Sequence, residues 1–452
     1  MKSLDLILSG GTVVTHEGEQ ACDVGIADGK IALLDQAIAD SAGEVIDARG
    51  LHIFPGLIDA HVHFNDPGRA EWEGIDTGSS ALVAGGGTMF FDMPLNSHPP
   101  TIDAASFPAK LNAAQTKAHV DFGLWGGLVL GNQDNLEELA DCGVVGFKAF
   151  MCDSGIADFL SVDHHVLRAG MKRIAKLGKL VAVHAESEAL TRELTQQAIA
   201  TGQTTLRAYL DSRPVRAELE AMSQAIEFAG ETGCALHIVH VSCGAGVALV
   251  TEARQRGVNV TCETCPHYLV LTEDDFQRLG APAKCAPPLR PKAEQDSLWE
   301  AVRNGHVATI GSDHSPSPPE MKADADIFRV WGGIAGVQHT LPLLLTEGGV
   351  ARNLAHSLIA RLTSFNVAER FRLPPSKGRL AVGADADLSL LDARQTFEVH
   401  AEDLLYRHKI SPYFGRALTG RVVRTILRGR TIFHDRRIIG PPGGRFVEPL
   451  RN

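Results

Sequence analysis

The sequence predicts an α/β fold, a (β/α)8 TIM-like barrel with a small β-sandwich domain built from both chain termini. The middle of the chain alternates eight apolar segments of strand length with helical segments, whereas both ends are rich in short β-prone runs. Near-continuous apolar strands separated by amphipathic helices are typical of a parallel sheet buried under helices. Eight such repeats predict a closed barrel.

The two ends of the chain share a β-rich pattern. The first fifty residues contain LDLILS, GGTVV and DVGIADGKIALLD, where Asp28-Gly29 between apolar runs predicts a hairpin. The last seventy-five contain GRLAVGADADLSLLD and GRVVRTILRGRTIF. Neither end has enough strands for an independent sheet. We therefore expect one discontinuous β-sandwich domain over residues 1–52 and 376–452, and a metal-binding barrel domain over residues 53–375.

Eight barrel strands are expected, and polar residues at their carboxyl ends are the first candidates for a site, because barrel enzymes place their active sites there. The strands are predicted over residues 56–64, 88–94, 119–128, 143–151, 179–186, 234–242, 258–265 and 307–315. Helical periodicity between strands is clearest in EALTRELTQQAIATG and AELEAMSQAIEFAGETG.

Composition excludes several classes of partner. The chain has 452 residues, of which 44% are hydrophobic and 21% charged, as in globular proteins with a sizeable core. A net charge of -11 without a Lys/Arg cluster argues against nucleic acid and anionic membranes as partners. No apolar stretch approaches the roughly 20 residues that span a bilayer, and the N-terminus lacks a signal-peptide pattern. We expect a cytoplasmic protein.

Cysteine usage fits a reducing compartment, because eight cysteines in a chain of this length do not form a dense disulfide pattern. Cys262 and Cys265 form a C-x-x-C pair, for which zinc and redox chemistry are alternatives to simple packing. The run VNVTCETCPHYLV predicts a strand rather than the start of a helix, and no second pair of ligands accompanies it. We therefore favour packing.

A set of histidines and one aspartate stands at the predicted strand ends. The first strand closes with His61-Val62-His63, whose alternate residues point to the same face and therefore into the barrel mouth. Later strands supply His184, His240 and Asp313. Neutral imidazole and carboxylate are the usual ligands of zinc and its neighbours, so these residues predict a metal site.

Lys148 lies within the apolar run GVVGFKAFM of the fourth predicted strand. A buried lysine tends to lose its proton and become nucleophilic. A neutral amine can add carbon dioxide to give a carbamate, an anionic group able to bridge two cations. The alternative is a lysine that reaches a carboxylate at the barrel mouth.

The remaining histidines are not expected to be ligands. His237 lies three residues before His240, so strand alternation predicts that it faces the helical shell. His267 and His314 are expected near the mouth, supporting the ligands from behind. Packing or surface positions are expected for the others, His52, His119, His164, His165 and His306.

On these residues the chain resembles the cyclic amidohydrolases, a group that includes dihydroorotases, hydantoinases, dihydropyrimidinases and allantoinases. The likeness runs from GGTVV through PGLIDAHVHF, GFKAFM, VHAE, HVS, CPHYL and SDHSP to GRLAVGADADLSLLD. It implies a barrel with a β-sandwich from both ends and a binuclear metal centre. The implied ligands are His61, His63 and Asp313 for the first metal, His184 and His240 for the second, and N6-carboxylated Lys148 as the bridge.

Within the group, long segments are most similar to allantoinases. They are HFNDPGRAEWEG, DMPLNSHPPT, AKCAPPLR, SDHSPSPPEMK, WGGIAGVQHTLPLL and YRHKISPYFGR. Dihydroorotases place an arginine two residues after the His-x-His to pair with the substrate carboxylate, and the residue here is Asn65. An uncharged ureide is therefore favoured, although Arg69 could reach the pocket and keeps dihydroorotase as an alternative. Ala286 stands where some relatives have a serine.

The resemblance implies hydrolysis of the hydantoin-ring amide of allantoin to allantoate, a step of purine and ureide catabolism. Asp313 would act as the general acid and base, while Asn96, Cys285 and Ser315 would contact the substrate. Two divalent ions, Zn²⁺ or alternatively Co²⁺, Mn²⁺ or Fe²⁺, are implied, with CO₂ as the lysine carbamate and a homotetramer or homodimer as the assembly. The alternatives are dihydroorotase or hydantoinase/dihydropyrimidinase activity on another cyclic amide, and a non-catalytic role as an assembly protein.

Overall fold

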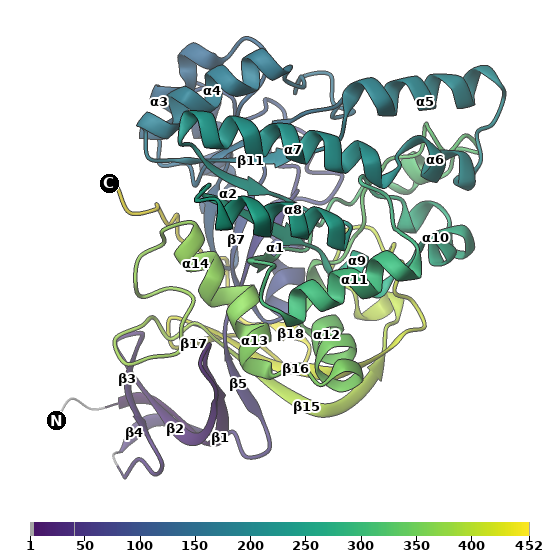
Figure 1. Ribbon diagram of the computed structural model, residues 1–452. Helices are drawn as coiled ribbons and strands as arrows, with labels where there is room; N and C mark the ends of the chain where they lie inside the picture. The colour runs from purple at the N-terminus through teal and green to yellow at the C-terminus, as the bar shows by residue number, and fades with distance from the viewer. Residues whose placement is uncertain (1–3, 40, 452) are drawn as a thin grey trace.

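The computed structural model describes residues 4–39 and 41–451; the first three residues of the expected N-terminal β-rich segment lie outside this range. Figure 1 shows two lobes, a barrel surrounded by helices and a β-rich lobe in which purple strands from the start of the chain are joined by yellow-green to yellow strands from residues 388–438. This is the predicted fold class: a (β/α)8 barrel with an appended sheet from both termini.

The barrel contains the eight predicted strands, of which the third is divided in two by Trp125. Its strands are β6 (Leu57–Val62), β7 (Gly87–Asp92), β8 (Asp121–Leu124), β9 (Gly126–Gly127), β10 (Phe147–Phe150), β11 (Leu180–His184), β12 (Ala235–Ile238), β13 (Val260–Thr264) and β14 (Thr309–Ile310). They pair in parallel in this order, as β6-β7-β8 and as β9 to β14. A parallel bridge between Val62 and His314 joins the first strand to the segment after the last.

Helices surround this sheet and line its mouth (Figure 1). They are α1 (Ile75–Ala84), α2 (Phe107–Lys117), α3 (Leu136–Asp141), α4 (His164–Lys176), α5 (Glu188–Ala200), α6 (Leu206–Ser212), α7 (Val215–Thr232), α8 (Gly244–Gln255), α9 (Pro266–Val270), α10 (Glu273–Leu279), α11 (Lys292–Arg303), α12 (Thr340–Leu344), α13 (His356–Ala360) and α14 (Asn366–Arg370). Both segments with clear helical periodicity form helices, α5 and α7.

Each barrel strand buries both faces, as its apolar sequence requires. Outward-facing residues such as Val181 and Ile238 pack under the helices. Inward-facing residues form a separate cluster that fills the barrel, including Phe91, Trp125 and Phe371. The barrel is therefore a packed core with room for chemistry only at its mouth.

Strands from both ends of the chain form one nine-stranded sheet. They are β1 (Leu4–Val14), β2 (Glu19–Ala27), β3 (Lys30–Asp35), β4 (Ala42–Asp47), β5 (His52–Pro55), β15 (Leu388–Glu398), β16 (Ala417–Leu427), β17 (Arg430–His434) and β18 (Arg437–Ile438). Antiparallel pairing of β5 with β15 joins the two termini. Asp28 and Gly29 have positive φ angles of 54° and 75° at the predicted hairpin between β2 and β3. The exact domain boundaries remain a prediction.

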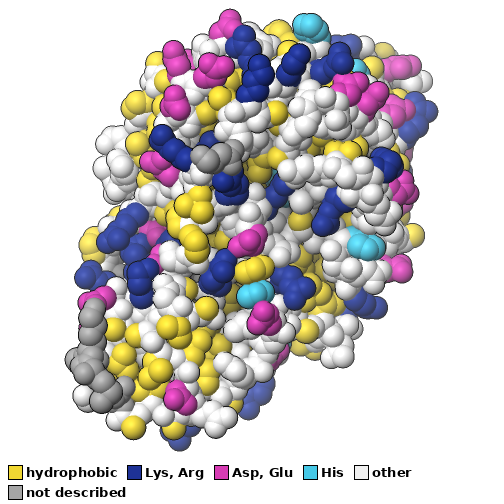
Figure 2. Space-filling model, turned by 60° about the vertical axis from the view of Figure 1, so that its left-hand side comes forward, with side chains coloured by type: hydrophobic (Ala, Val, Ile, Leu, Met, Phe, Trp, Pro, Cys, Tyr) yellow, Lys and Arg dark blue, Asp and Glu magenta, His cyan; other side chains and the backbone are white. Residues whose placement is uncertain are grey.

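On the face shown in Figure 2, basic and acidic side chains are interspersed over both lobes. Within the described residues, no helix combines the length and the apolar character needed to cross a bilayer.

A buried ion cluster fastens the terminal sheet to the barrel. Lys377 Nζ lies 2.6 Å from an oxygen of Asp121, the first residue of β8, and 2.7 Å from Asp387 beside β15. Its side chain is 6% exposed, whereas the Lys30 side chain, which pairs with the neighbouring Asp385, is 52% exposed.

We expect Lys377→Ala to destabilise the protein by about 3–5 kcal/mol, because buried Asp387 loses its paired cation and buried Asp121 retains, among the described residues, only Arg428. Lys30→Ala is the matched control and should cost about 0–1 kcal/mol, as exposed pairs do. Urea unfolding followed by circular dichroism measures both. Equal unfolding midpoints for the two variants would show that the buried cluster does not fasten the lobes.

Candidate metal centre

The structure brings the six predicted ligand residues together at the carboxyl ends of the barrel strands. His61 lies on β6, Lys148 on β10 and His184 at the end of β11. The other three, His63, His240 and Asp313, follow β6, β12 and β14 within three residues. Five of them line one cavity of about 510 Å³, and Lys148 is wholly buried beside them.

The first group consists of His61, His63 and Asp313. Asp313 Oδ1 lies 3.2 Å from His61 Nε2 and 3.4 Å from His63 Nε2. Burial lowers the pKa of His63 to about 4, so its imidazole is neutral near pH 7. The ligand atoms of the three residues are close enough to one another to hold a single cation.

The second group consists of His184 and His240. His184 Nδ1 and His240 Nε2 face each other at 3.0 Å. Burial lowers the pKa of His240 well below its usual value, so its ring is neutral near pH 7 and one of its nitrogens carries a lone pair. The His240 ring lies 5.4 Å from the His61 ring, which places the two groups side by side.

Lys148, the residue predicted to bridge the two groups, lies on β10 in the barrel interior. Its side chain is completely buried and its Nζ has no hydrogen-bond partner. Burial lowers the pKa of the amine to about 8, partly offset by Asp313 and Glu263. The centroid of the Phe150 ring lies 5.0 Å from Nζ. The alternative of a lysine paired with a carboxylate is therefore not what the structure shows.

Two carboxylates that orient the ligands were missed from the sequence. Glu263 Oε1 lies 2.7 Å from His61 Nδ1, and Glu186 Oε2 lies 2.7 Å from His184 Nε2. Burial alone would raise the pKa of each, but the histidine partners, and Arg213 in the case of Glu186, lower both to about 2. Such carboxylate–histidine pairs fix the tautomer of a metal ligand. The sequence signal that could have identified both residues is a glutamate at or just after the end of a buried strand.

The three expected substrate contacts, Asn96, Cys285 and Ser315, all line the cavity. Asn96 Nδ2 lies 3.2 Å from His63 Nδ1, so its amide also orients that ligand. Asn65 is buried and is not among the lining residues. The Arg69 guanidinium donates to the carbonyls of Asn96 and Ser97 and pairs with Asp158.

The expectation for His237 was wrong. Its ring packs 5.5 Å from Phe371 in the barrel interior, and its Nε2 lies 3.9 Å from Glu263. His240 adopts a left-handed conformation, φ 42°, which breaks strand alternation, so both histidines face inward. His314 supports the site through its backbone, since its carbonyl accepts from His63 N at 2.8 Å.

The Cys262–Cys265 pair fits packing. Cys262 lies on β13, Cys265 caps the short helix α9, and burial raises the pKa of Cys262 to about 12. All eight cysteines are free thiols.

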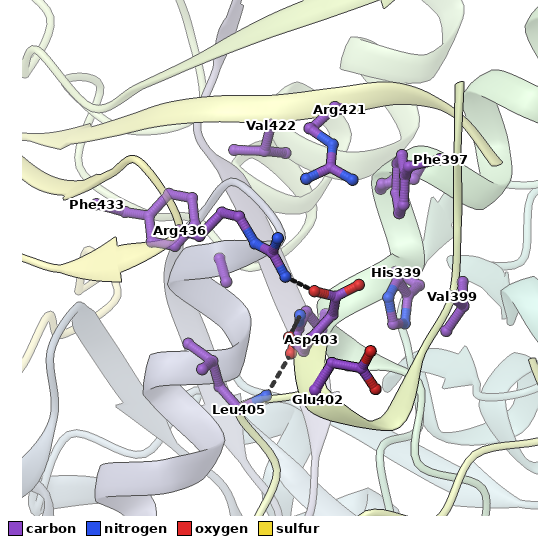
Figure 3. A pocket seen from close by; sticks show the side chains of 13 residues that line it. His339, Phe397, Val399, Glu402, Asp403, Leu405, Arg421, Val422, Phe433 and Arg436 are labelled. Carbon is purple, nitrogen blue, oxygen red and sulfur yellow. Dashed lines mark hydrogen bonds and ion pairs between the residues drawn. The ribbon is translucent and has the colours of Figure 1, made fainter. Parts of the chain in front are cut away.

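A smaller cavity of about 110 Å³ lies under the terminal sheet (Figure 3). Three of its charged side chains have partners of their own: Arg436 pairs with Asp403, and Arg421 stacks 4.5 Å over the Phe397 ring. Ligand pockets usually measure about 300–1,000 Å³, and the cavity at the barrel mouth falls in this range and holds the histidines predicted as ligands.

The chain belongs to the amidohydrolase family, whose model matches residues 52–432. It is 56% identical to an allantoinase of Rubrobacter xylanophilus, over 100% of this chain and 99% of that protein. An allantoinase of Deinococcus radiodurans is 50% identical over 99% of each chain. Among solved structures, an L-hydantoinase from Arthrobacter aurescens has a TM-score of 0.96 and 35% identity, covering 98% of this chain and 100% of that one.

We expect Glu263→Gln to weaken divalent-metal affinity and kcat/KM by about 10–100-fold. A neutral amide oxygen accepts from His61 Nδ1 more weakly than the carboxylate does, and so orients the His61 ring less firmly. The exposed Glu252→Gln is the control and should leave both unchanged. Metal titration and steady-state kinetics measure the effect. Wild-type affinity in Glu263→Gln would assign that carboxylate to packing alone.

Proposed function

We propose that the protein is a binuclear metal-dependent allantoinase, which hydrolyses the hydantoin-ring amide of allantoin to allantoate. The observation that carries this proposal is the convergence of two groups of side chains on one cavity, with Lys148 buried beside them. The groups are His61, His63 and Asp313, and His184 and His240. Full-length relatives named allantoinase support the substrate.

The residues present fit two divalent ions. The imidazole nitrogens of His61 and His63 converge with the carboxylate oxygens of Asp313, and the buried Lys148 amine has no hydrogen-bond partner. His61, His63 and Asp313 would hold one ion, and His184 and His240 the other. Carboxylated Lys148 would contribute to both: its Nζ forms a bond to the carbon of CO₂ and loses a proton, which yields an anionic carbamate. Zn²⁺ is the favoured ion, with Co²⁺, Mn²⁺ or Fe²⁺ as alternatives. When bound, such ions polarise the scissile carbonyl and supply a water acidic enough to attack near neutral pH.

Asp313 is the group placed to move the proton. Burial alone would raise the pKa of its carboxyl, but His61, His63 and His240 lower it well below the usual range. It is therefore ionised, lines the cavity and can accept the proton of the attacking water. Delivery of that proton to the departing ring nitrogen completes the hydrolysis.

The charges around the cavity favour a neutral substrate. Among the described residues, the cations that line it are Arg213, Lys284 and Arg329. Arg213 pairs with buried Glu186, and Lys284 donates to the carbonyls of Ile327 and Val330. Arg329 stands at the rim beside Asp326 with its side chain 75% exposed.

The orientation of Arg69 bears on the dihydroorotase alternative. Its guanidinium is occupied by Asp158 and by two carbonyls of the loop that carries Asn96, and Arg69 is not among the lining residues. Of the cations that line the described cavity, Arg213 and Lys284 already have partners and Arg329 lies at the rim, which disfavours recognition of the carboxylate of dihydroorotate. Hydantoinase or dihydropyrimidinase activity is the stronger second candidate, because the fold matches an L-hydantoinase so closely.

We further propose that the enzyme acts on a small cyclic ureide in the cytoplasm, as a homotetramer or homodimer. Eight unpaired thiols support the reducing compartment. The assembly follows from the family resemblance.

A substrate panel on metal-quantified protein tests the proposal. We expect kcat/KM for allantoin to exceed that for hydantoin, dihydrouracil and dihydroorotate by at least about 10-fold, on the order of 1.4 kcal/mol of transition-state stabilisation. Preference for hydantoin or dihydrouracil would reassign the substrate. Absence of turnover by fully loaded protein would instead support a non-catalytic role.

Lys148→Ala should abolish both stable metal binding and turnover, because the variant removes the amine that forms the carbamate. Apoprotein reconstituted with Zn²⁺ should regain activity only when bicarbonate is supplied. The control is Lys292→Ala, at an exposed lysine of α11 that pairs with Asp296. Full activity of Lys148→Ala would remove the bridging carbamate from the mechanism.

A further inference from the structure

A second group of metal-ligating side chains lies far from the barrel mouth. Glu19 begins β2, His52 begins β5 and His356 begins α13, and we refer to these three residues as the junction cluster. Figure 1 shows α13 beside the terminal strands, and it contacts β1. The cluster therefore joins the terminal sheet to the helical wall of the barrel lobe.

The junction cluster is separate from the candidate metal centre. His52 precedes β6, whereas His61 and His63 lie at and beyond its other end. A strand of six residues extends roughly 20 Å, so the two groups cannot share an ion. No residue of the junction cluster lines the catalytic cavity.

The ligand atoms of the junction cluster converge on one point. Glu19 Oε1 lies 3.3 Å from His356 Nδ1, and Glu19 Oε2 lies 3.8 Å from His52 Nε2. The two imidazole rings meet edge to face, with centroids 4.9 Å apart. One ligand atom from each residue lies within 4.8 Å of the other two. Bonds of about 2.0–2.2 Å to a common zinc ion need only small side-chain rotations from this arrangement.

His356 Nδ1, the nitrogen that faces Glu19, is shielded from solvent and makes no hydrogen bond. His52 faces Glu19 through Nε2, and its other nitrogen, Nδ1, is likewise shielded and makes no hydrogen bond. Burial, followed by the effect of His356, lowers the pKa of His52, which keeps that ring neutral near pH 7. A shielded, unpaired imidazole nitrogen is costly unless something accepts its lone pair or its proton.

We propose that Glu19, His52 and His356 bind one divalent transition-metal ion, such as Zn²⁺, that ties β2 and β5 to α13. Two imidazoles and one carboxylate form a zinc ligand set with an open fourth position. The Glu19 side chain is 34% exposed, so a water can fill that position. The ion stabilises the junction between the lobes and takes no part in hydrolysis.

Zinc stoichiometry tests the proposal. Wild type, Glu19→Ala, His356→Ala and the control His165→Ala, which changes an exposed histidine of α4, are dialysed against buffered free Zn²⁺ and analysed by mass spectrometry for bound metal. Wild type and His165→Ala should bind one Zn²⁺ per chain more than Glu19→Ala and His356→Ala. Added Zn²⁺ should raise the midpoint of thermal unfolding more in wild type and His165→Ala than in Glu19→Ala and His356→Ala.

The difference in bound Zn²⁺ between the variants does not depend on the metals at the barrel mouth. If the barrel mouth binds no ion, the number of Zn²⁺ per chain falls equally in all four proteins, and the difference of one Zn²⁺ per chain remains. Turnover, where present, should be the same in all four proteins. Equal zinc counts and equal thermal shifts in the four proteins would overturn the junction site. Glu19 is exposed, so its substitution tests the site without removing a packed side chain.

Discussion

The site depends on how the barrel closes between its first strand and the segment after its last. His63 N donates to the His314 carbonyl at 2.8 Å, and the buried Asp59 carboxylate accepts from His61 N and Ser312 N at 3.1 and 3.0 Å. Burial raises the pKa of Asp59 to about 6, yet these backbone donors favour its ionised form. This closure is what holds Asp313 within 3.4 Å of both histidines of the first strand.

Closure also fixes unusual backbone at the strand ends. His240 and Asp313 have φ angles of 42° and 46°, and Asn65 and Asn96 have 65° and 67°. A non-glycine residue in this region costs about 1–3 kcal/mol and persists only where its surroundings impose it. Here the hydrogen-bonded strands impose it, and each turn redirects a side chain at the mouth. Four of the ten non-glycine residues with positive φ in the described chain thus lie at the strand ends around the mouth, and two of them are expected ligands.

Patterns that repeat along the chain were predictable, and departures from them were not. Eight apolar strands and the helices α5 and α7 followed from periodicity, and the same-face placement of His61 and His63 followed from alternation. The inward orientation of His237 did not, because it depends on the left-handed turn at His240. Glu263 and Glu186 could not be ranked above other glutamates, since their roles come from contacts between strands. The junction cluster joins residues more than 300 positions apart, which no local pattern reveals.

The balance of charge at the barrel mouth explains why the predicted ligand residues would bind cations. Glu186 has Arg213 as a partner, whereas the ion pairs of Asp313 and Glu263 among the described residues are with imidazoles. Burial lowers the pKa of His63 to about 4, so protonating that ring to neutralise Asp313 is unfavourable at neutral pH. Lys148 cannot balance both carboxylates, because its amine makes no hydrogen bond to either and burial lowers its pKa to about 8. Buried anions without compensating cations are strongly destabilising. Divalent ions held by the neutral imidazoles would supply the missing charge, and a carbamate on Lys148 would turn its unpaired amine into a further ligand.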